Sequence, residues 1–176
     1  MRRESAEMRA EMNKIFWAAD STVQTNDYTT YPQTGIGQVF PLFVKPEYQV
    51  CNHAKNGRST KSFMDEGRLK AIEEKIGAGD FLFIQFGHKQ TAEKNNVPLV
   101  DLYSMSRMEL KKAGEKNSRR WYMFFPEGEY KNHPEKSEDN THLRYDGAVN
   151  FASLIARGLR EIGGIYAELL LDDLKL

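Results

Sequence analysis

Two short segments near opposite ends of the chain hold residues that could form a catalytic triad. Ser21 lies two residues after the apolar stretch 16–19. Asp139 and His142 lie close together near the other end. A serine hydroxyl is a weak nucleophile at neutral pH unless a base removes its proton and a third group orients that base. The order serine, acid, histidine therefore supplies the three groups that an acyl-transferring hydrolase needs.

The composition leaves room for one ordinary hydrophobic core. The chain has 176 residues, of which 40% are hydrophobic, and its 25 basic residues balance 25 acidic ones. We therefore expect a single domain over residues 1–176, with its core at about 13–163. Because there is no net charge to attract nucleic acid or an anionic membrane, the expected partner is small or neutral.

The cysteine content and the first residues bear on the compartment. Cys51 is the only cysteine, which excludes an internal disulfide and suits a reducing environment. Residues 1–20 begin with charged side chains and are expected to run from a helix into a strand. They lack the apolar centre and the cleavage site of a secretory signal, and no run is long enough to cross a bilayer. The sequence therefore predicts a cytoplasmic protein.

Apolar runs alternate with amphipathic stretches, a pattern typical of an α/β fold with helices on both faces of a mostly parallel sheet. The expected strands are 15–18, 48–52, 81–86 and 97–102. The expected helices are 35–44, 62–76, a helix capped by Ser104, and 146–162 followed by Gly163. Residues 116–141 are polar and show no lasting period, so we expect a loop there.

Ligands of such sheets bind outside the carboxyl ends of the strands. Ser21, Gly57 and His88 follow the first three expected strands, and the 139–142 segment can fold over the same edge. Four segments there resemble the sequence blocks of the SGNH (GDSL-like) hydrolases, most closely those of the rhamnogalacturonan acetylesterase branch. They are ADSTVQ at 19–24, NHAKNGRS at 52–59, FIQFGH at 83–88 and DNTHL at 139–143.

The resemblance implies a three-layer α/β/α, flavodoxin-like fold and a serine esterase that deacetylates a carbohydrate. The expected substrate is an acetylated pectin or rhamnogalacturonan oligosaccharide. Ser21 is the implied nucleophile, His142 the general base and Asp139 the residue that orients it. The backbone N–H groups of Ser21 and Gly57 are the implied donors to the oxyanion. No metal or organic cofactor is implied.

Two further residues are candidates for contact with the substrate. His88 follows the third expected strand, although it could equally stabilise the turn in which it lies. Trp121 belongs to an aromatic cluster just before the acid and the base. This cluster either packs in the core or offers a stacking surface for a sugar.

One position departs from the family pattern. The third block of the family reads Gly-His-Asn-Asp, and its asparagine side chain completes the oxyanion hole, whereas this chain has Lys89 and Gln90 at these positions. Loss of one such donor typically lowers turnover by about 10²–10³-fold. The alternative function is therefore a catalytically impaired relative that binds pectic sugars without efficient turnover.

The connection between the expected strands 81–86 and 97–102 is short. Parallel neighbours need a crossover of about a dozen residues or more, usually containing a helix. We therefore expect a sheet shortened by strands and helices missing after residue 88, on the order of 60 residues, or a break in the chain near 88–91. A shortened sheet would expose apolar faces, leave an unpaired edge and distort the site.

Overall fold

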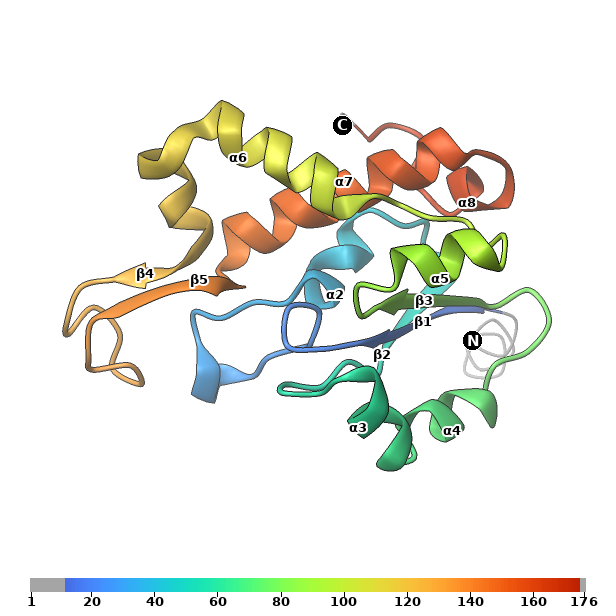
Figure 1. The fold of residues 1–176 in the computed structure, drawn as a ribbon, viewed down its shortest axis with the longest axis horizontal. Helices are drawn as coiled ribbons and strands as arrows, with labels where there is room; N and C mark the ends of the chain where they lie inside the picture. The colour runs from blue at the N-terminus through green and yellow to red at the C-terminus, as the bar shows by residue number, and fades with distance from the viewer. Residues whose placement is uncertain (1–11, 175–176) are drawn as a thin grey trace, which may run out of the picture.

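The computed structural model describes residues 12–174 as a parallel sheet with helices on both faces and a separate β-hairpin (Figure 1). The strand order of the sheet is β2–β1–β3, with β1 at Asn13–Ala19, β2 at Tyr48–Asn52 and β3 at Phe81–Gln85. The predicted α/β class and these three strands are confirmed. The helix expected near the start of the chain falls in residues 1–11, outside the described residues.

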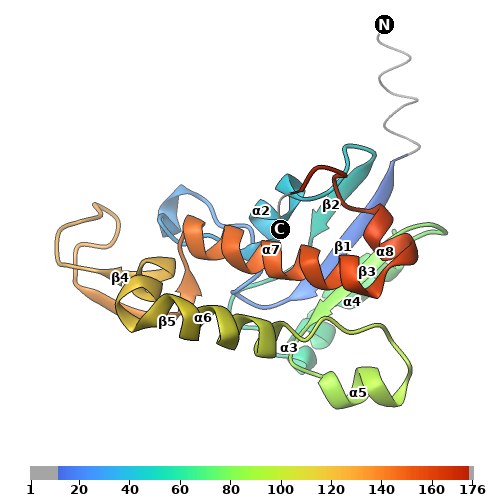
Figure 2. The same cartoon turned by 90° about the horizontal axis from the view of Figure 1, so that it is seen from above.

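One face of the sheet is covered by helices from the first and last thirds of the described chain (Figures 1 and 2). They are α2 (Ile36–Val39) with the 3-10 turn Phe40–Leu42, α7 (Tyr145–Ile162) and α8 (Gly164–Glu168), and α6 (Leu102–Ser118) packs against α7. The predicted helix 146–162, followed by Gly163, is confirmed as α7. The helix predicted within 35–44 is confirmed as α2 and its 3-10 extension.

The opposite face carries α3 (Thr60–Asp65) and α4 (Arg68–Glu73). The prediction of a single helix over 62–76 is therefore wrong, because two short helices lie there. Gly67 adopts φ 71°, a left-handed conformation that interrupts the helical hydrogen-bond series and is available to glycine without steric cost. Ser59 starts α3 through a reciprocal capping box with Ser62.

β1 is the centre of the sheet, because it pairs with β2 on one side and β3 on the other. Its side chains alternate between two apolar cores, as the two-residue period of a strand requires. Ile15, Trp17 and Ala19 enter the larger core, which α2, α7 and α8 complete. Phe16 and Ala18 enter the smaller core with apolar residues of α3 and α4. The strand that leads to Ser21 is thus fixed from both faces.

The predicted strand 97–102 is wrong. After β3 the chain forms α5 (Lys89–Lys94) and then an irregular segment that leads into α6. Pro98 lacks the N–H group that a central strand would donate. Val100 of this segment packs against α7 instead, where Gly158 has no side chain. A Cβ on Gly158 would lie 2.5 Å from Val100 Cγ1.

The start of α6 also differs from the prediction. Asp101, and not Ser104, is the capping residue, because its carboxylate accepts a hydrogen bond from the Ser104 N–H at 3.1 Å. A carboxylate at this position also interacts favourably with the positive end of the helix dipole. Asp101 forms an ion pair with Lys89 at 2.7 Å, which links the first residue of α5 to the start of α6.

The loop predicted over 116–141 is wrong as well. β4 (Tyr122–Phe125) and β5 (Ser137–Leu143) form an antiparallel hairpin that projects from the body of the molecule (Figure 1). Met123 and Phe125 are buried and alternate with half-buried neighbours, which is the pattern of a one-sided strand. The predicted catalytic acid and histidine therefore lie on β5, directly before α7.

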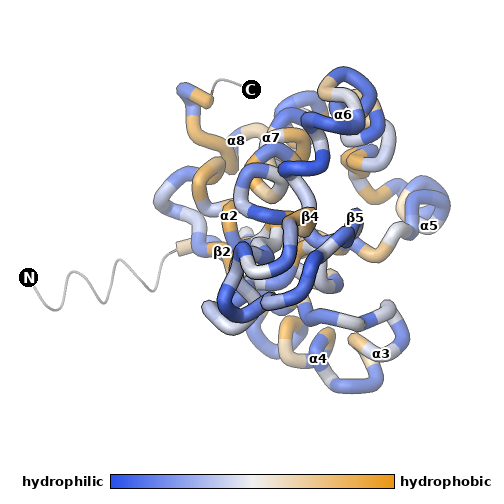
Figure 3. The backbone as a smooth tube through the Cα atoms, turned by 90° about the vertical axis from the view of Figure 1, so that its left-hand side faces the viewer, coloured by the Kyte–Doolittle hydropathy of each residue, from blue (hydrophilic) through white to orange (hydrophobic). Residues whose placement is uncertain are grey.

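The outer side of β3 shows the shortening that the sequence predicts. Within residues 12–174 β3 pairs only with β1, so its other edge has no strand partner. Ile84 of β3 is 62% exposed. The chain is continuous over residues 88–91, where α5 begins. α5 is hydrophilic and stands apart at this side of the molecule (Figure 3). The sheet therefore ends where a longer flavodoxin-like sheet would continue.

Candidate active site

The three residues predicted to form a triad lie together in the structure. His142 Nδ1 is 2.6 Å from Asp139 Oδ2, and His142 Nε2 is 3.0 Å from Ser21 Oγ. An ionised carboxylate can only accept hydrogen bonds, so Nδ1 carries the proton that it donates to Asp139. Nε2 is then free to accept a proton from the Ser21 hydroxyl. This is the arrangement by which a serine becomes a nucleophile.

The Asp139 carboxylate is held by its own strand. Its Oδ1 accepts hydrogen bonds from the backbone N–H groups of Thr141 at 2.7 Å and of His142 at 3.1 Å. Partial burial alone raises the pKa of Asp139, but the hydrogen bonds from the His142 ring and from these two N–H groups together lower it below its ordinary value. The carboxylate is therefore ionised at neutral pH, as an acceptor for Nδ1 must be.

Ser21 lies in a tight turn at the carboxyl end of β1. The Asp20 carbonyl accepts from the N–H groups of Val23 at 3.3 Å and Gln24 at 3.2 Å, which closes the turn. The Asp20 carboxylate accepts from the Thr22 N–H at 2.9 Å and from its hydroxyl at 2.8 Å. Because both ends of the turn are bonded, the Ser21 side chain is held at the surface toward His142.

A second loop at this edge carries Gly57. The β1–β2 pairing continues past the strand ends, since the N–H groups of His53 and Lys55 donate to Trp17 and Ala19 at 3.0 Å each. Gly57 is exposed and has φ 71°, a conformation that suits glycine. The loop therefore follows the same edge of the sheet as the turn that bears Ser21.

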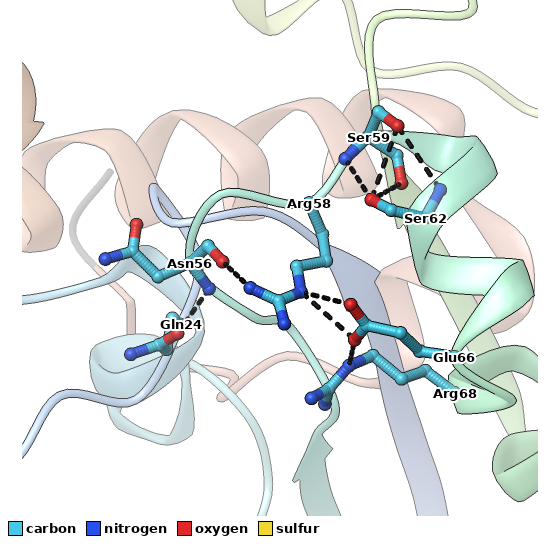
Figure 4. Close-up of polar contacts among 7 residues, drawn as sticks. All are labelled: Gln24, Asn56, Arg58, Ser59, Ser62, Glu66 and Arg68. Atoms are coloured by element: carbon cyan, nitrogen blue, oxygen red, sulfur yellow. Dashed lines mark hydrogen bonds and ion pairs between the residues drawn. The ribbon is translucent and has the colours of Figure 1, made fainter.

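Figure 4 shows how this loop is fixed on both sides. On one side the Gln24 side chain accepts a hydrogen bond from the Asn56 N–H. This bond joins the loop to the turn of residues 20–24, named the nucleophile turn after the predicted role of Ser21. On the other side Arg58 donates to the Asn56 carbonyl at 2.8 Å and pairs with Glu66 at 2.9 Å. Arg68 shares the same carboxylate at 2.8 Å. The loop is thus tied through Gln24 to the turn that carries Ser21 and through Glu66 to the end of α3.

The residues after β3 turn toward other partners. His88 Nε2 lies 2.6 Å from Thr60 Oγ1 at the start of α3, a contact that fits the turn-stabilising alternative. Lys89, which stands where the family pattern has asparagine, directs its ammonium to Asp101 at 2.7 Å. This hydrogen bond raises the pKa of Lys89 and lowers that of Asp101 to about 2. Lys89 is therefore a partner of the α6 cap.

The position of Trp121 favours packing over sugar stacking. Its side chain is 9% exposed, which leaves little of the ring for a ligand. Its carbonyl accepts from the Arg144 N–H at 2.9 Å, and a Cβ on Gly147 of α7 would lie 2.1 Å from that same oxygen. Trp121 thus anchors the base of the hairpin to the start of α7.

Two positioning residues were not singled out from the sequence. Asn52, the last residue of β2, donates to the Val23 carbonyl at 2.7 Å and accepts from the Ala54 N–H at 3.1 Å. Gln24 joins the nucleophile turn to the Gly57 loop, as described above. Both lie within the sequence blocks of the resemblance, a signal that could have marked them as candidates but not their hydrogen-bond partners.

The described residues form neither a metal-binding cluster nor a membrane-spanning helix. Residues 12–174 hold no group of three or more His, Cys, Asp and Glu side chains arranged to bind a metal ion. Among the helices of that same range, none is both long enough and apolar enough to cross a membrane.

Comparisons with known proteins show the family to which the chain belongs. The chain is 30% identical to the rhamnogalacturonan acetylesterase RhgT of Bacillus subtilis over 210 aligned positions, which cover 85% of this chain and 90% of the relative. It is 28% identical to the probable rhamnogalacturonan acetylesterase YesY of the same organism, over 86% of this chain and 94% of the relative. No family model matches the chain.

A solved structure has the same fold. The crystal structure of YxiM from Bacillus subtilis superimposes with a TM-score of 0.72 at 20% identity, over 86% of this chain and 57% of that one. The chain belongs to the SGNH hydrolases, in the branch of the rhamnogalacturonan acetylesterases.

The alignment with RhgT also measures a length difference. The aligned 85% of this chain of 176 residues is about 150 residues, yet the alignment spans 210 positions. About 60 positions, the difference between 210 and 150, therefore have no counterpart in this chain.

Proposed function

We propose that this chain is a serine esterase that removes acetyl groups from acetylated rhamnogalacturonan or pectin oligosaccharides. The observation that carries the proposal is the continuous hydrogen-bonded series from Asp139 through His142 to Ser21. The named relatives support a carboxylic ester hydrolase that acts on a carbohydrate.

In the first half of the proposed reaction, Ser21 Oγ attacks the acetyl carbonyl carbon while His142 Nε2 takes the hydroxyl proton. The carbonyl oxygen becomes an oxyanion, to which the N–H groups of Ser21 and Gly57 donate. When the tetrahedral intermediate collapses, the bond from the carbonyl carbon to the sugar oxygen breaks. His142 gives its proton to that oxygen, and the acetyl group remains on Ser21.

In the second half, water repeats the attack. His142 removes a proton from a water molecule, whose oxygen bonds to the acetyl carbon. The bond to Ser21 Oγ then breaks, the proton returns to that oxygen, and acetic acid leaves and ionises to acetate in water. Asp139 stays ionised throughout and stabilises the imidazolium that forms in each half.

A second candidate function is sugar binding with little turnover. It is favoured by the ion pair of Lys89 with Asp101, because a lysine has no side-chain amide and this one directs its ammonium to a carboxylate. On this reading the triad is formed, but the tetrahedral intermediate lacks one donor, which corresponds to a loss of about 10²–10³-fold in turnover.

A fluorophosphonate probe and an acetate-release assay together distinguish the two functions. The probe phosphonylates a serine whose hydroxyl a base activates, whereas acetate release reports turnover of the ester. We expect one probe molecule per chain by intact mass, with the label on Ser21, together with release of acetate from an acetylated oligosaccharide. Ser21→Ala should abolish both while the circular dichroism spectrum stays unchanged.

Ser104→Ala is the matched control, since this serine is exposed on α6. It should label and hydrolyse as the unmodified protein does. Labelling of Ser21 without acetate release would favour the binding function, whereas hydrolysis that survives Ser21→Ala would remove Ser21 from the mechanism.

A further inference from the structure

Two exposed tyrosines lie on the segment that follows the nucleophile turn. Tyr28 is 86% exposed and Tyr31 is 52% exposed. Their rings are nearly parallel, with an interplanar angle of 13° and centroids 6.2 Å apart. Large aromatic surface that faces water as an ordered pair is typical of a place where a ligand or partner binds.

The backbone under the two rings is held from outside the segment. The side-chain amide nitrogen of Asn132, in the hairpin loop, lies 3.2, 3.0 and 2.6 Å from the carbonyl oxygens of Tyr28, Thr29 and Tyr31. Asp27 caps the 3-10 turn Tyr28–Thr30 by accepting from the Thr29 N–H at 2.8 Å. A surface that is ordered before the ligand arrives loses less entropy on binding.

The Tyr31 ring is also fixed by aromatic contacts. It meets the ring of Tyr130 edge-on, with centroids 5.6 Å apart, and Tyr130 in turn packs on the buried Phe125 of β4 at 4.9 Å. Such edge-to-face contacts are favourable and define ring orientation. The pair is therefore attached to the hairpin core.

The tyrosine pair is continuous with the proposed active site at both ends. On one side its segment begins directly after the turn that bears Ser21. On the other side the Thr34 N–H donates to the carbonyl of Leu143, the residue after His142, at 2.8 Å. Figures 1 and 2 both show this segment beside the hairpin at the same end of the molecule. A chain-like ligand that reaches Ser21 can therefore extend over these rings.

We propose that Tyr28 and Tyr31 form a stacking platform for a pyranose ring of the oligosaccharide that carries the acetyl ester. A pyranose presents C–H bonds on its faces and hydroxyl groups around its rim, so it requires a flat apolar surface bordered by polar groups. The polar side chains of Asp27 and Thr29 belong to the same segment as the two rings, and that of Asn132 is hydrogen-bonded to its backbone, so polar groups are available beside the pair. This proposal deepens the proposed function and rests on it for the identity of the substrate.

The test compares two substrates in the Tyr28→Ala/Tyr31→Ala double variant. With an acetylated rhamnogalacturonan oligosaccharide, we expect KM to rise about tenfold while kcat stays unchanged, because the lost contacts lie outside the reacting groups. With an aryl acetate, which is too small to reach the platform, kcat/KM should not change. Tyr103→Ala is the matched control, since Tyr103 on α6 is 74% exposed, and it should match the unmodified protein on both substrates.

Direct binding separates this proposal from the proposed function. In Ser21→Ala, calorimetry with the deacetylated oligosaccharide should show binding that the double tyrosine change weakens about tenfold and that Tyr28→Phe/Tyr31→Phe retains. If the unmodified protein hydrolyses neither substrate but binding still depends on the tyrosines, the esterase function fails and the platform stands. Oligosaccharide binding and KM that do not respond to the double change would overturn the platform. Equal loss on the aryl acetate would also overturn it, because the tyrosines would then support the fold.

Discussion

β1 and β3 lie side by side in register, yet their surroundings differ. β1 has strand partners on both sides and apolar cores on both faces. β3 is equally apolar in sequence, Phe-Leu-Phe-Ile-Gln, but in the described chain it pairs on one side only. Ala18 of β1 is 3% exposed, whereas its register partner Ile84 of β3 is 62% exposed.

The difference shows that the candidate site depends on the complete half of the sheet. Ser21 follows β1, Gly57 follows β2, and His142 lies on the hairpin that leads into α7, which covers β1. β3 has a sequence typical of a buried central strand, and Phe81, Leu82 and Phe83 pack against the two cores. In the described chain it lacks the second strand partner that would bury it completely. We propose that the positions unmatched in the alignment with RhgT correspond to strand and helix units that would extend the sheet beyond β3.

Among the changes that test this comparison, Asp139→Asn, in the complete half, should have the largest effect. The asparagine amide can donate to His142 Nδ1, which places the imidazole proton on Nε2, where it can no longer accept from Ser21. We expect turnover of an aryl acetate to fall by about 10³–10⁴-fold, with an unchanged unfolding temperature. Asp65→Asn, an exposed carboxylate on α3, is the control. Normal turnover in a folded Asp139→Asn protein would remove this residue from the mechanism.

An intermediate effect is expected from Gly35→Ala in the same half. A Cβ on Gly35 would lie 2.0 Å from the Gln24 carbonyl oxygen, a backbone atom of the nucleophile turn. The turn must shift, so we expect a loss of roughly 1–3 kcal/mol in the free energy of unfolding together with lower turnover. Urea denaturation and an aryl acetate assay measure both.

Gly77→Ala is the matched control for this change. A Cβ on Gly77 would lie 3.8 Å from its nearest neighbour, the Asp80 carboxylate, which is ordinary contact. This variant should be nearly unchanged in stability and turnover. A Gly35→Ala protein as stable and active as Gly77→Ala would show that the nucleophile turn can relax without cost.

The smallest effect on stability should come from Ile84→Lys, on the incomplete side. Since Ile84 is largely exposed, we expect the free energy of unfolding to change by less than about 0.5 kcal/mol. Self-association at high concentration should decrease, because a lysine on an edge strand opposes pairing with another chain. Sedimentation velocity and urea denaturation report these two quantities.

Ile72→Ala supplies the contrast for this prediction, because Ile72 is fully buried in the smaller core that β1 shares. Its loss should cost about 2–5 kcal/mol. If Ile84→Lys destabilised the protein as strongly as Ile72→Ala, β3 would have to be buried in solution, and the comparison between the two halves would be wrong.

The sequence predicts the elements whose residues show a clear apolar run or helical period. The three parallel strands and α7 follow from apolar runs and from the helical stripe that ends at Gly163. The apolar residues Val97, Leu99 and Val100 predict a strand over 97–102, but Val97 and Leu99 are exposed and Val100 packs against a glycine far along the chain. The hairpin was not predicted because β4 is only four residues long and β5 is mostly polar, so that their pairing defines them.

The residues of the candidate site and its surroundings also divide into those that the sequence predicts and those that it does not. Ser21, Asp139 and His142 could be predicted because their types, order and surrounding sequence blocks are distinctive. The positions of Asn52 and Asn132 in the structure could not, because each acts through backbone carbonyls of residues distant in sequence. Hydrogen bonds of this kind leave no local pattern.

The contact between His142 and Ser21 spans 121 positions of the chain. The sheet pairs β1 with β2 and with β3, and both are nearer to β1 along the chain than His142 is to Ser21. The contact between His142 and Ser21 closes a loop of more than half the molecule. Closure of long loops is costly in entropy, and contacts between distant residues slow folding. Recovery of hydrolysis during refolding therefore reports on the joining of the two ends of the chain, a later and larger event than formation of the sheet.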